Sequence, residues 1–198
     1  MIRRAAFAIL VFCVVGVAAS GKERWELKFS PKRFDTYLYQ GSVVSKLDGL
    51  YLYMVVDIEN TSNTDVPLDL GVKVETDAKG KTYFNRKFTV VEKPLAKRLR
   101  LKDYLNASEM RETTLGAGEK VTCLMIFGKV SALADKLDVV VGGLKSQVSL
   151  KKGKRTLIDE DLILQYRRPG DEFRRQLDKI KLAKRMWVVR SRRDAPYK

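Results

Sequence analysis

Three consecutive carboxylates, Asp159, Glu160 and Asp161, form the densest acidic cluster of the sequence. Paired carboxylates can hydrolyse glycosidic bonds when they face each other across a cleft. Clustered carboxylates can also bind Ca²⁺ or Mg²⁺, but such sites need more oxygen ligands at suitable spacing, and no EF-hand-like pattern surrounds these three. We therefore interpret the cluster as a solvated turn and keep a histidine-free hydrolase as the alternative.

The sequence contains no histidine and only two cysteines, Cys13 and Cys123. The lack of histidine excludes histidine triads, histidine general bases and histidine metal ligands. Cys123 lies among Val121, Met125 and Phe127, which is typical of a buried thiol that acts as a small hydrophobe. As a nucleophile it would need a lysine or a carboxylate as its base. We expect no catalytic residue, no metal and no cofactor, and predict that the protein is not an enzyme.

Basic side chains are the more informative group. The chain holds 39 basic and 24 acidic residues, a net charge of +15. Three basic clusters lie at residues 93–102, 151–155 and 167–175, and folding that brought two of them together would attract polyanions through the summed field. A solvated basic surface is the alternative. The candidate contacts for an anionic partner are Arg98, Arg100, Lys152, Arg155, Arg167, Arg168, Arg174 and Arg175.

The N-terminus predicts export. Arg3 and Arg4 precede an apolar run at residues 5–19 that ends in small residues, which is the pattern of a secretory signal peptide cleaved near Ala19 or Ser20. The run is shorter than the roughly 20 residues that a membrane-spanning helix needs, and an uncleaved anchor is the alternative. Cleavage would leave Cys123 alone, so no internal disulfide is expected. We predict a periplasmic or extracellular location.

The middle of the chain must supply the elements that position these groups. Short segments rich in Val, Ile, Tyr, Phe and Thr, bounded by Gly, Asp, Asn or Pro, indicate β strands at residues 33–44, 49–60, 70–91, 119–130 and 136–144. The lack of amphipathic helices between most of them favours a sandwich or barrel. Alternation along residues 51–59 places Leu52, Met54, Val56 and Ile58 on the core face.

Turn residues divide these strands. Asn60–Asp65 predicts a corner in which Asn and Asp side chains bond nearby backbone, Asp77–Gly80 predicts a tight hairpin, and Gly116 with Gly118 predicts a turn before a late strand. Residues 93–110 are ambiguous because Pro94 could start a helix whereas residues 99–102 alternate like a strand.

Residues 151–198 differ in composition, with 16 basic and 7 acidic side chains. The segment TLIDEDLILQY predicts a strand that begins at an acidic turn. A turn at RRPGDEF, a short helix up to Leu177 and a final strand at RMWVVR follow.

Four segments in order, the strand ending VVDIENTS, the loop ETDAKGKTY, the turn LGAGEKV and the strand CLMIFGKV, resemble the immunoglobulin-like domains of unknown function found in exported bacterial proteins, which include small secreted mycobacterial antigens. The resemblance covers about residues 35–145. It implies a two-sheet sandwich that is usually an accessory or binding module, and it carries over no catalytic residue. The basic segment at 93–102 and the chain after residue 151 depart from it.

Together these features predict a mainly β fold. A signal peptide (1–20) precedes an immunoglobulin-like antiparallel β-sandwich (21–150) and a basic α+β C-terminal extension (151–198). The predicted role is an exported, non-enzymatic binding or structural module that contacts an anionic envelope polymer, a lipid headgroup or an acidic protein. Nucleic acid is not expected, because no nucleic-acid fold signature accompanies the charge. A subunit of an envelope assembly, paired through an exposed strand edge, is a further alternative.

Overall fold

The computed structural model describes residues 23–41, 46–78, 80–131, 133–151, 154–168 and 179–194. The predicted signal peptide, the short helix expected up to Leu177 and the candidate residues Lys152, Arg174 and Arg175 lie outside these ranges. In the part of the chain that is described, no helix has both the length and the apolar character needed to cross a membrane.

The described residues form ten strands and two helices. In chain order they are β1 (Glu23–Tyr39), β2 (Gly49–Asn60), β3 (Val66–Pro67), β4 (Gly71–Thr76), β5 (Thr82–Phe84), α1 (Thr89–Leu99), α2 (Ala107–Glu112), β6 (Thr114–Leu115), β7 (Lys120–Lys129), β8 (Lys136–Lys151), β9 (Lys154–Arg167) and β10 (Lys181–Asp194). All pairings between these strands are antiparallel. The predicted mainly β class is confirmed.

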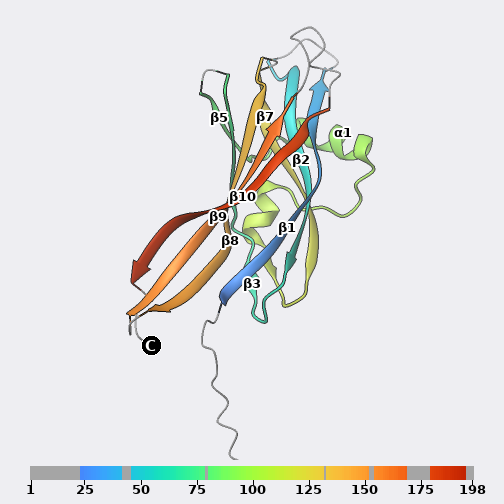
Figure 1. Ribbon diagram of the computed structural model, residues 1–198. Helices are drawn as coiled ribbons and strands as arrows, with labels where there is room; N and C mark the ends of the chain where they lie inside the picture. The colour runs from blue at the N-terminus through green and yellow to red at the C-terminus, as the bar shows by residue number, and fades with distance from the viewer. Residues whose placement is uncertain are drawn as a thin grey trace, which may run out of the picture.

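One folded sheet makes most of the molecule, in the order β10-β9-β8-β1-β2-β7. Two strands pair with the same edge of β8. The first half of β8 pairs with β4, and Lys145–Gln147 pair with the start of β1. On its other side, β4 pairs with β5. β1 then runs along β2 from Leu27 to Tyr39. It thereby joins the layer of β5, β4, β8, β9 and β10 to the layer of β2 and β7, and the two layers form a nearly closed, barrel-like body (Figure 1).

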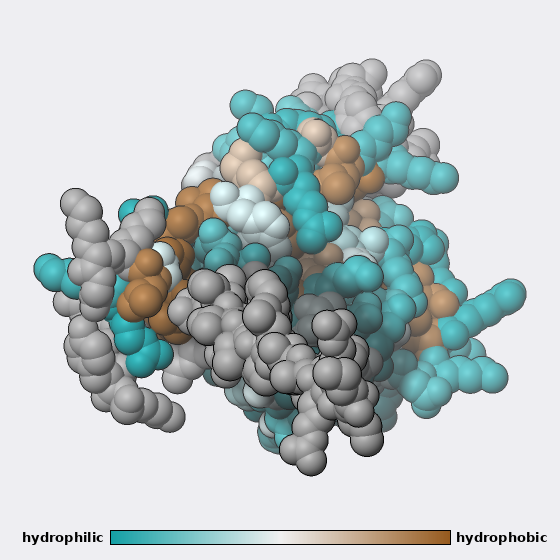
Figure 2. Space-filling view, turned by 60° about the horizontal axis from the view of Figure 1, so that its bottom comes forward, coloured by the Kyte–Doolittle hydropathy of each residue, from teal (hydrophilic) through white to brown (hydrophobic). Residues whose placement is uncertain are grey.

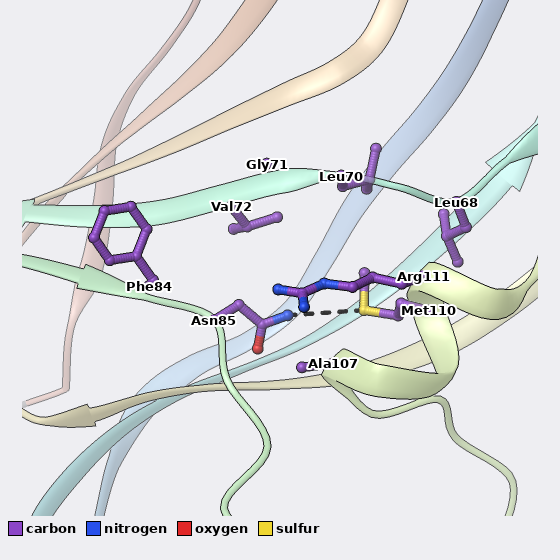
Figure 3. Close-up of a pocket in the computed structure, with 9 residues that line it drawn as sticks. All are labelled: Leu68, Leu70, Gly71, Val72, Phe84, Asn85, Ala107, Met110 and Arg111. Atoms are coloured by element: carbon purple, nitrogen blue, oxygen red, sulfur yellow. Dashed lines mark hydrogen bonds between the residues drawn. The ribbon is translucent and has the colours of Figure 1, made fainter.

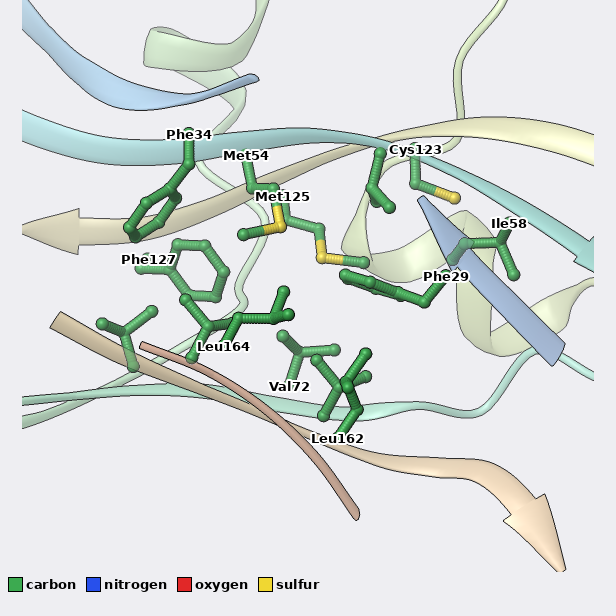
Figure 4. Packing of buried hydrophobic residues seen from close by; sticks show 14 of the residues in the cluster. Phe29, Phe34, Met54, Ile58, Val72, Cys123, Met125, Phe127, Leu162 and Leu164 are labelled. Atoms are coloured by element: carbon green, nitrogen blue, oxygen red, sulfur yellow. The ribbon is translucent and has the colours of Figure 1, made fainter. Parts of the chain in front are cut away.

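An apolar core fills the space between the layers (Figure 4). The four β2 side chains predicted to point inward, at positions 52, 54, 56 and 58, are all 0% exposed, so that prediction is confirmed. Leu162 and Leu164 of β9 meet them from the other layer. Phe34 of β1 packs on Tyr166 with ring centroids 4.3 Å apart. The core is therefore shared by strands from both ends of the chain.

A second apolar cluster covers the opposite face of β2. Tyr51, Tyr53 and Val55 are buried there beneath Val91 and Leu95 of α1. This helix explains why β2 is buried on both faces and why its sequence is almost continuously apolar.

The ambiguous segment at 93–110 contains helices rather than a strand. Pro94 lies inside α1, and Arg100, which follows the last helical residue, adopts the left-handed conformation with φ 56°. Asn106 then starts α2 with a capping box, because its side chain accepts from the backbone N–H of Glu109 while the Glu109 side chain accepts from the backbone N–H of Asn106.

The corner predicted at Asn60–Asp65 is confirmed. Asn60 is fully buried at the end of β2, and its Nδ2 donates to the carbonyl oxygens of Thr64 at 2.8 Å and Leu115 at 2.9 Å. Its Oδ1 accepts from the backbone N–H of Ser62 at 3.0 Å. The predicted hairpin after β4 is also present, with Gly80 at φ +58°. The polar residues of this corner are thus structural.

The strands β8, β9 and β10 extend beyond the body as a three-stranded ribbon, at the lower left of Figure 1. The predicted boundary at residue 150 falls beside the turn from β8 to β9. The described part of residues 151–198 consists mostly of strands, and β9 contributes to the same core as the preceding domain. The final strand predicted at RMWVVR is confirmed as part of β10.

Candidate functional site

The solvated turn predicted for Asp159, Glu160 and Asp161 is wrong. β9 runs through all three residues because it pairs with β8 on one side and β10 on the other. Since successive side chains of a strand point to opposite faces, Asp159 and Asp161 lie on the outer face and Glu160 lies on the face of Leu162. The strand therefore does not direct the three carboxylates toward one point.

Asp159 is the centre of a polar network that links three strands. Its carboxylate is 4% exposed and accepts hydrogen bonds from Ser146 Oγ of β8 at 2.8 Å and from Ser191 Oγ of β10 at 2.8 Å. Arg193 donates to the same carboxylate at 2.7 Å. Burial acts to raise the pKa of Asp159, but these donors outweigh it and the pKa is lowered. A carboxylate held ionised in this way fits a structural role better than proton transfer.

Asp161 pairs with Arg190 at the place where β8 bulges. Arg190 Nε lies 3.6 Å from Asp161 Oδ1, and burial raises the pKa of the Asp161 carboxyl. Gly142 of β8 makes room for this pair, because a Cβ at this glycine would lie 2.9 Å from the Arg190 guanidinium and 3.0 Å from Asp161 Oδ1. The acidic cluster thus holds part of β10 in place.

Cys123 is 0% exposed in the core. Burial raises the pKa of its thiol to about 12. The prediction of a buried thiol that packs as a hydrophobe is confirmed.

The predicted basic contacts lie on separate parts of the molecule. Arg98 and Arg100 belong to the α1 region, where the Arg98 guanidinium lies 5.5 Å from the centre of the Tyr37 ring. Arg155 and Arg167 lie at opposite ends of β9, and Arg168 is only 3% exposed. In Figure 1, α1 and the ribbon lie on opposite sides of the body. The candidates within the described residues therefore do not form one patch.

A basic surface that the sequence interpretation missed lies along β10. This strand carries six basic and one acidic residue. Among its described side chains all except Met186 and Ser191 are exposed, and Figure 2 shows hydrophobic and hydrophilic side chains mixed on the left, where the ribbon lies. We call this surface the β10 edge and define it by Lys181, Lys184, Arg185, Trp187, Val188, Val189, Arg190, Arg192 and Arg193.

The backbone of β10 has one open side. β10 pairs with β9 alone, and within the described ranges no backbone hydrogen bond joins it to another element. Register shifts after Leu182 and after Val189 leave the segment Lys184–Val189 regular between them. A strand edge of this kind can accept a further strand, while its charges oppose pairing with a second copy of itself.

A pocket lies between β4, the residue that follows β5, and α2 (Figure 3). Within the described part of the chain, no group of three or more Cys, Asp or Glu residues is arranged to hold a metal ion. No protein family, curated protein or solved structure matches the chain.

Proposed function

We propose that this chain is an exported, non-enzymatic binding module that contacts an acidic partner protein through the β10 edge. One observation carries the proposal: β10 is an exposed edge strand with six basic residues, and its outer backbone has no partner among the described residues.

Several of these positive charges are available to a partner. The side chains of Lys181, Lys184 and Arg192 have no hydrogen bond or ion pair in the part that the structure describes. The Arg185 guanidinium donates to the carbonyl oxygen of Phe29 at 3.4 Å, its one hydrogen bond to a described residue. Arg190, in contrast, is engaged by Asp159 and Asp161. Lys181 and Arg192 lie on either side of the regular segment and Lys184 begins it, so an acidic chain lying along β10 would meet these cations in turn.

The open backbone favours a protein over other anions. An extended peptide can bond to the free N–H and C=O groups of an edge strand, whereas a polymer of sulfates or a lipid headgroup can use only the charges. Trp187, Val188 and Val189 are 39%, 42% and 39% exposed and add apolar contact area. We therefore favour an extended acidic segment that also carries apolar residues.

Export and an immunoglobulin-like sandwich belong to the same proposal. Export is supported by the signal-like composition of residues 1–20, and the sandwich by two antiparallel layers over one core. The strands β9 and β10, which follow residue 151, lie outside the pattern that the resemblance implies. Mass spectrometry of the protein recovered from its host would test export, with a mature N-terminus near Ser20 expected and an intact N-terminus contradicting cleavage.

Binding to a synthetic acidic strand tests the β10 edge. The probe is a fluorescent ten-residue peptide that alternates Glu and Thr, followed by fluorescence anisotropy. A first variant removes three charges from the edge, and a matched variant removes three from the α1 region: Lys184→Gln, Arg185→Gln and Arg192→Gln against Lys93→Gln, Lys97→Gln and Lys102→Gln. We expect the β10 variant to bind the peptide about tenfold more weakly than the wild type. Three exposed ion pairs of about 0.5 kcal/mol each add to roughly 1.5 kcal/mol of binding free energy. The affinity of the matched α1 variant for the peptide should fall by less than about twofold.

The same binding experiment is repeated with two anions that are not peptides. Dextran sulfate and anionic phospholipid vesicles present charge without a peptide backbone. Binding to either one as tightly as to the peptide would contradict an acidic protein partner and favour charge-driven adhesion. Equal losses in the two triple variants would contradict the β10 edge itself, as would affinity for the peptide that does not fall with added salt.

A further inference from the structure

A pocket with a volume of about 110 Å³ lies three strands away from the β10 edge, where β4 begins. Its floor is apolar, because Leu68, Val72, Ala107 and Met110 are between 0% and 7% exposed. Phe84 stands on the rim and is 51% exposed. The pocket therefore offers an apolar interior that is open to solvent.

Two side chains with nitrogen donors, Asn85 and Arg111, line the pocket beside this apolar floor. Among the residues that the structure describes, the Nδ2 of Asn85 has only the thioether sulfur of Met110 as a partner, at 3.9 Å, and thioether sulfur is a weak acceptor. The Asn85 Oδ1 is used by the backbone N–H of Ile126 at 3.2 Å, which fixes the direction of the amide. The Asn85 NH₂ group therefore has donor capacity to spare.

Arg111 supplies the second donor, and it carries a charge. It lies in the last turn of α2, and within the described residues it has no hydrogen bond or ion pair. Figure 3 shows its guanidinium extending over the pocket toward Asn85. None of the nine lining residues is acidic. The guanidinium and the amide NH₂ group can both donate to a carboxylate, and the apolar floor can contact the hydrocarbon tail of the same molecule.

We propose that this pocket binds a small monocarboxylate, with the carboxylate bonded to Arg111 and Asn85 and a short aliphatic tail on the floor formed by Leu68, Val72 and Met110. A dry cavity of about 150 Å³ accommodates benzene, so this smaller volume limits the tail to about four or five carbon atoms. Two sources have this chemistry: a free short-chain acid, and the C-terminal carboxylate of a peptide that ends in an aliphatic residue. The inference is independent of the β10 edge.

The experiment is a titration of the full chain followed by ¹H–¹⁵N NMR. Isovalerate represents the free acid, N-acetyl-leucine represents a peptide C-terminus, and isovaleramide has the same tail as isovalerate without the charge. We expect shifts of the Gly71 amide, the Asn85 side-chain NH₂ and the Arg111 Nε–H. We also expect at least one acid to bind about tenfold or more tightly than the amide, because a charge-assisted pair is lost in the amide.

Two variants isolate the contribution of the Arg111 charge. Arg111→Gln should weaken binding of the acid about tenfold, whereas Arg86→Gln, which removes the same charge just outside the lining, should leave it unchanged. Thermal unfolding of each variant establishes that it is folded.

The titrations distinguish the two sources of the carboxylate and can exclude a carboxylate site altogether. Isovalerate binding without N-acetyl-leucine binding supports a free acid, and the reverse supports a peptide C-terminus. Equal affinity for acid and amide, or a folded Arg111→Gln variant that binds like the wild type, overturns the carboxylate assignment. Absence of shifts at these three residues with either acid at about 50 mM overturns the site, since ligands of this size bind in the millimolar range.

Discussion

Replacement of Asp57 by asparagine should lower the stability of the protein in a pH-dependent way. Asp57 is 4% exposed on the outer face of β2. It accepts from Lys32 Nζ at 2.7 Å, Lys120 Nζ at 2.7 Å and Thr122 Oγ1 at 2.9 Å. Burial acts to raise its pKa, but the bonds from Lys120, Lys32 and Thr122 outweigh burial and lower the pKa from 3.8 to about 2. Asparagine keeps the shape of the side chain and removes the charge.

The magnitude follows from this pKa difference. A group with a lower pKa in the folded state than in the unfolded state stabilises the fold above the unfolded pKa, and this stabilisation is lost as the pH falls through the folded pKa. A difference of nearly two pKa units corresponds to about 2 kcal/mol. The free energy of unfolding of Asp57→Asn should therefore lie about 2 kcal/mol below that of the wild type at pH 6, and only about 1 kcal/mol below it at pH 3.

Urea unfolding monitored by tryptophan fluorescence at a series of pH values between 3 and 7 measures this difference. The matched control is Glu59→Gln, two residues further along the same strand. Glu59 lies 3.5 Å from Lys28, and the side chains of this pair are 36% and 61% exposed, so we expect a change of less than about 0.5 kcal/mol. The reasoning is refuted if Asp57→Asn is as stable as the control at pH 6, or if its deficit does not change with pH.

Three further predictions concern the ribbon and the core. Asp159→Asn should speed amide hydrogen exchange in β10 much more than in β2, because the network that it forms with Ser146, Ser191 and Arg193 is lost; equal effects on the two strands would contradict this. Leu164→Ala should lower the free energy of unfolding by about 2–5 kcal/mol, whereas Val188→Ala at the exposed edge should lower it by less than about 1 kcal/mol. In a Cys13→Ser background, Cys123 should not react with a disulfide reagent at pH 8 until urea unfolds the chain, since burial raises the pKa of its thiol to about 12; fast reaction of the folded protein would contradict its burial.

The core face of the sheet could be predicted from the sequence because strand alternation is a local signal. Leu52, Met54, Val56 and Ile58 alternate with residues of the other face, and all four are fully buried. The corner at Asn60 was also predictable, because its amide bonds the backbone four residues away. Its bond to the carbonyl oxygen of Leu115, in contrast, joins residues far apart in the sequence and could not be predicted.

Features that depend on distant residues could not be predicted in the same way. The acidic triplet resembles a turn by composition, yet the partners of Asp159 are 13, 32 and 34 residues away. Likewise, basic clusters in the sequence do not reveal which of them meet in space: Arg98 belongs to α1, whereas Arg155 belongs to β9 in the ribbon. The continuous apolar run of β2 did carry a signal for burial on both faces, but not for the helix that covers it.

Hydrogen exchange of the β10 amides, with and without the alternating Glu/Thr peptide, tests the central claim most directly. In the free protein the outward-facing amides between Lys184 and Val189 should exchange fast, because their side of the strand is open. Added peptide should protect these amides at least about tenfold and leave those of β2 and β7 unchanged. Binding that shifts only lysine and arginine side chains, with no new protection in β10, would contradict pairing of a partner strand with this edge.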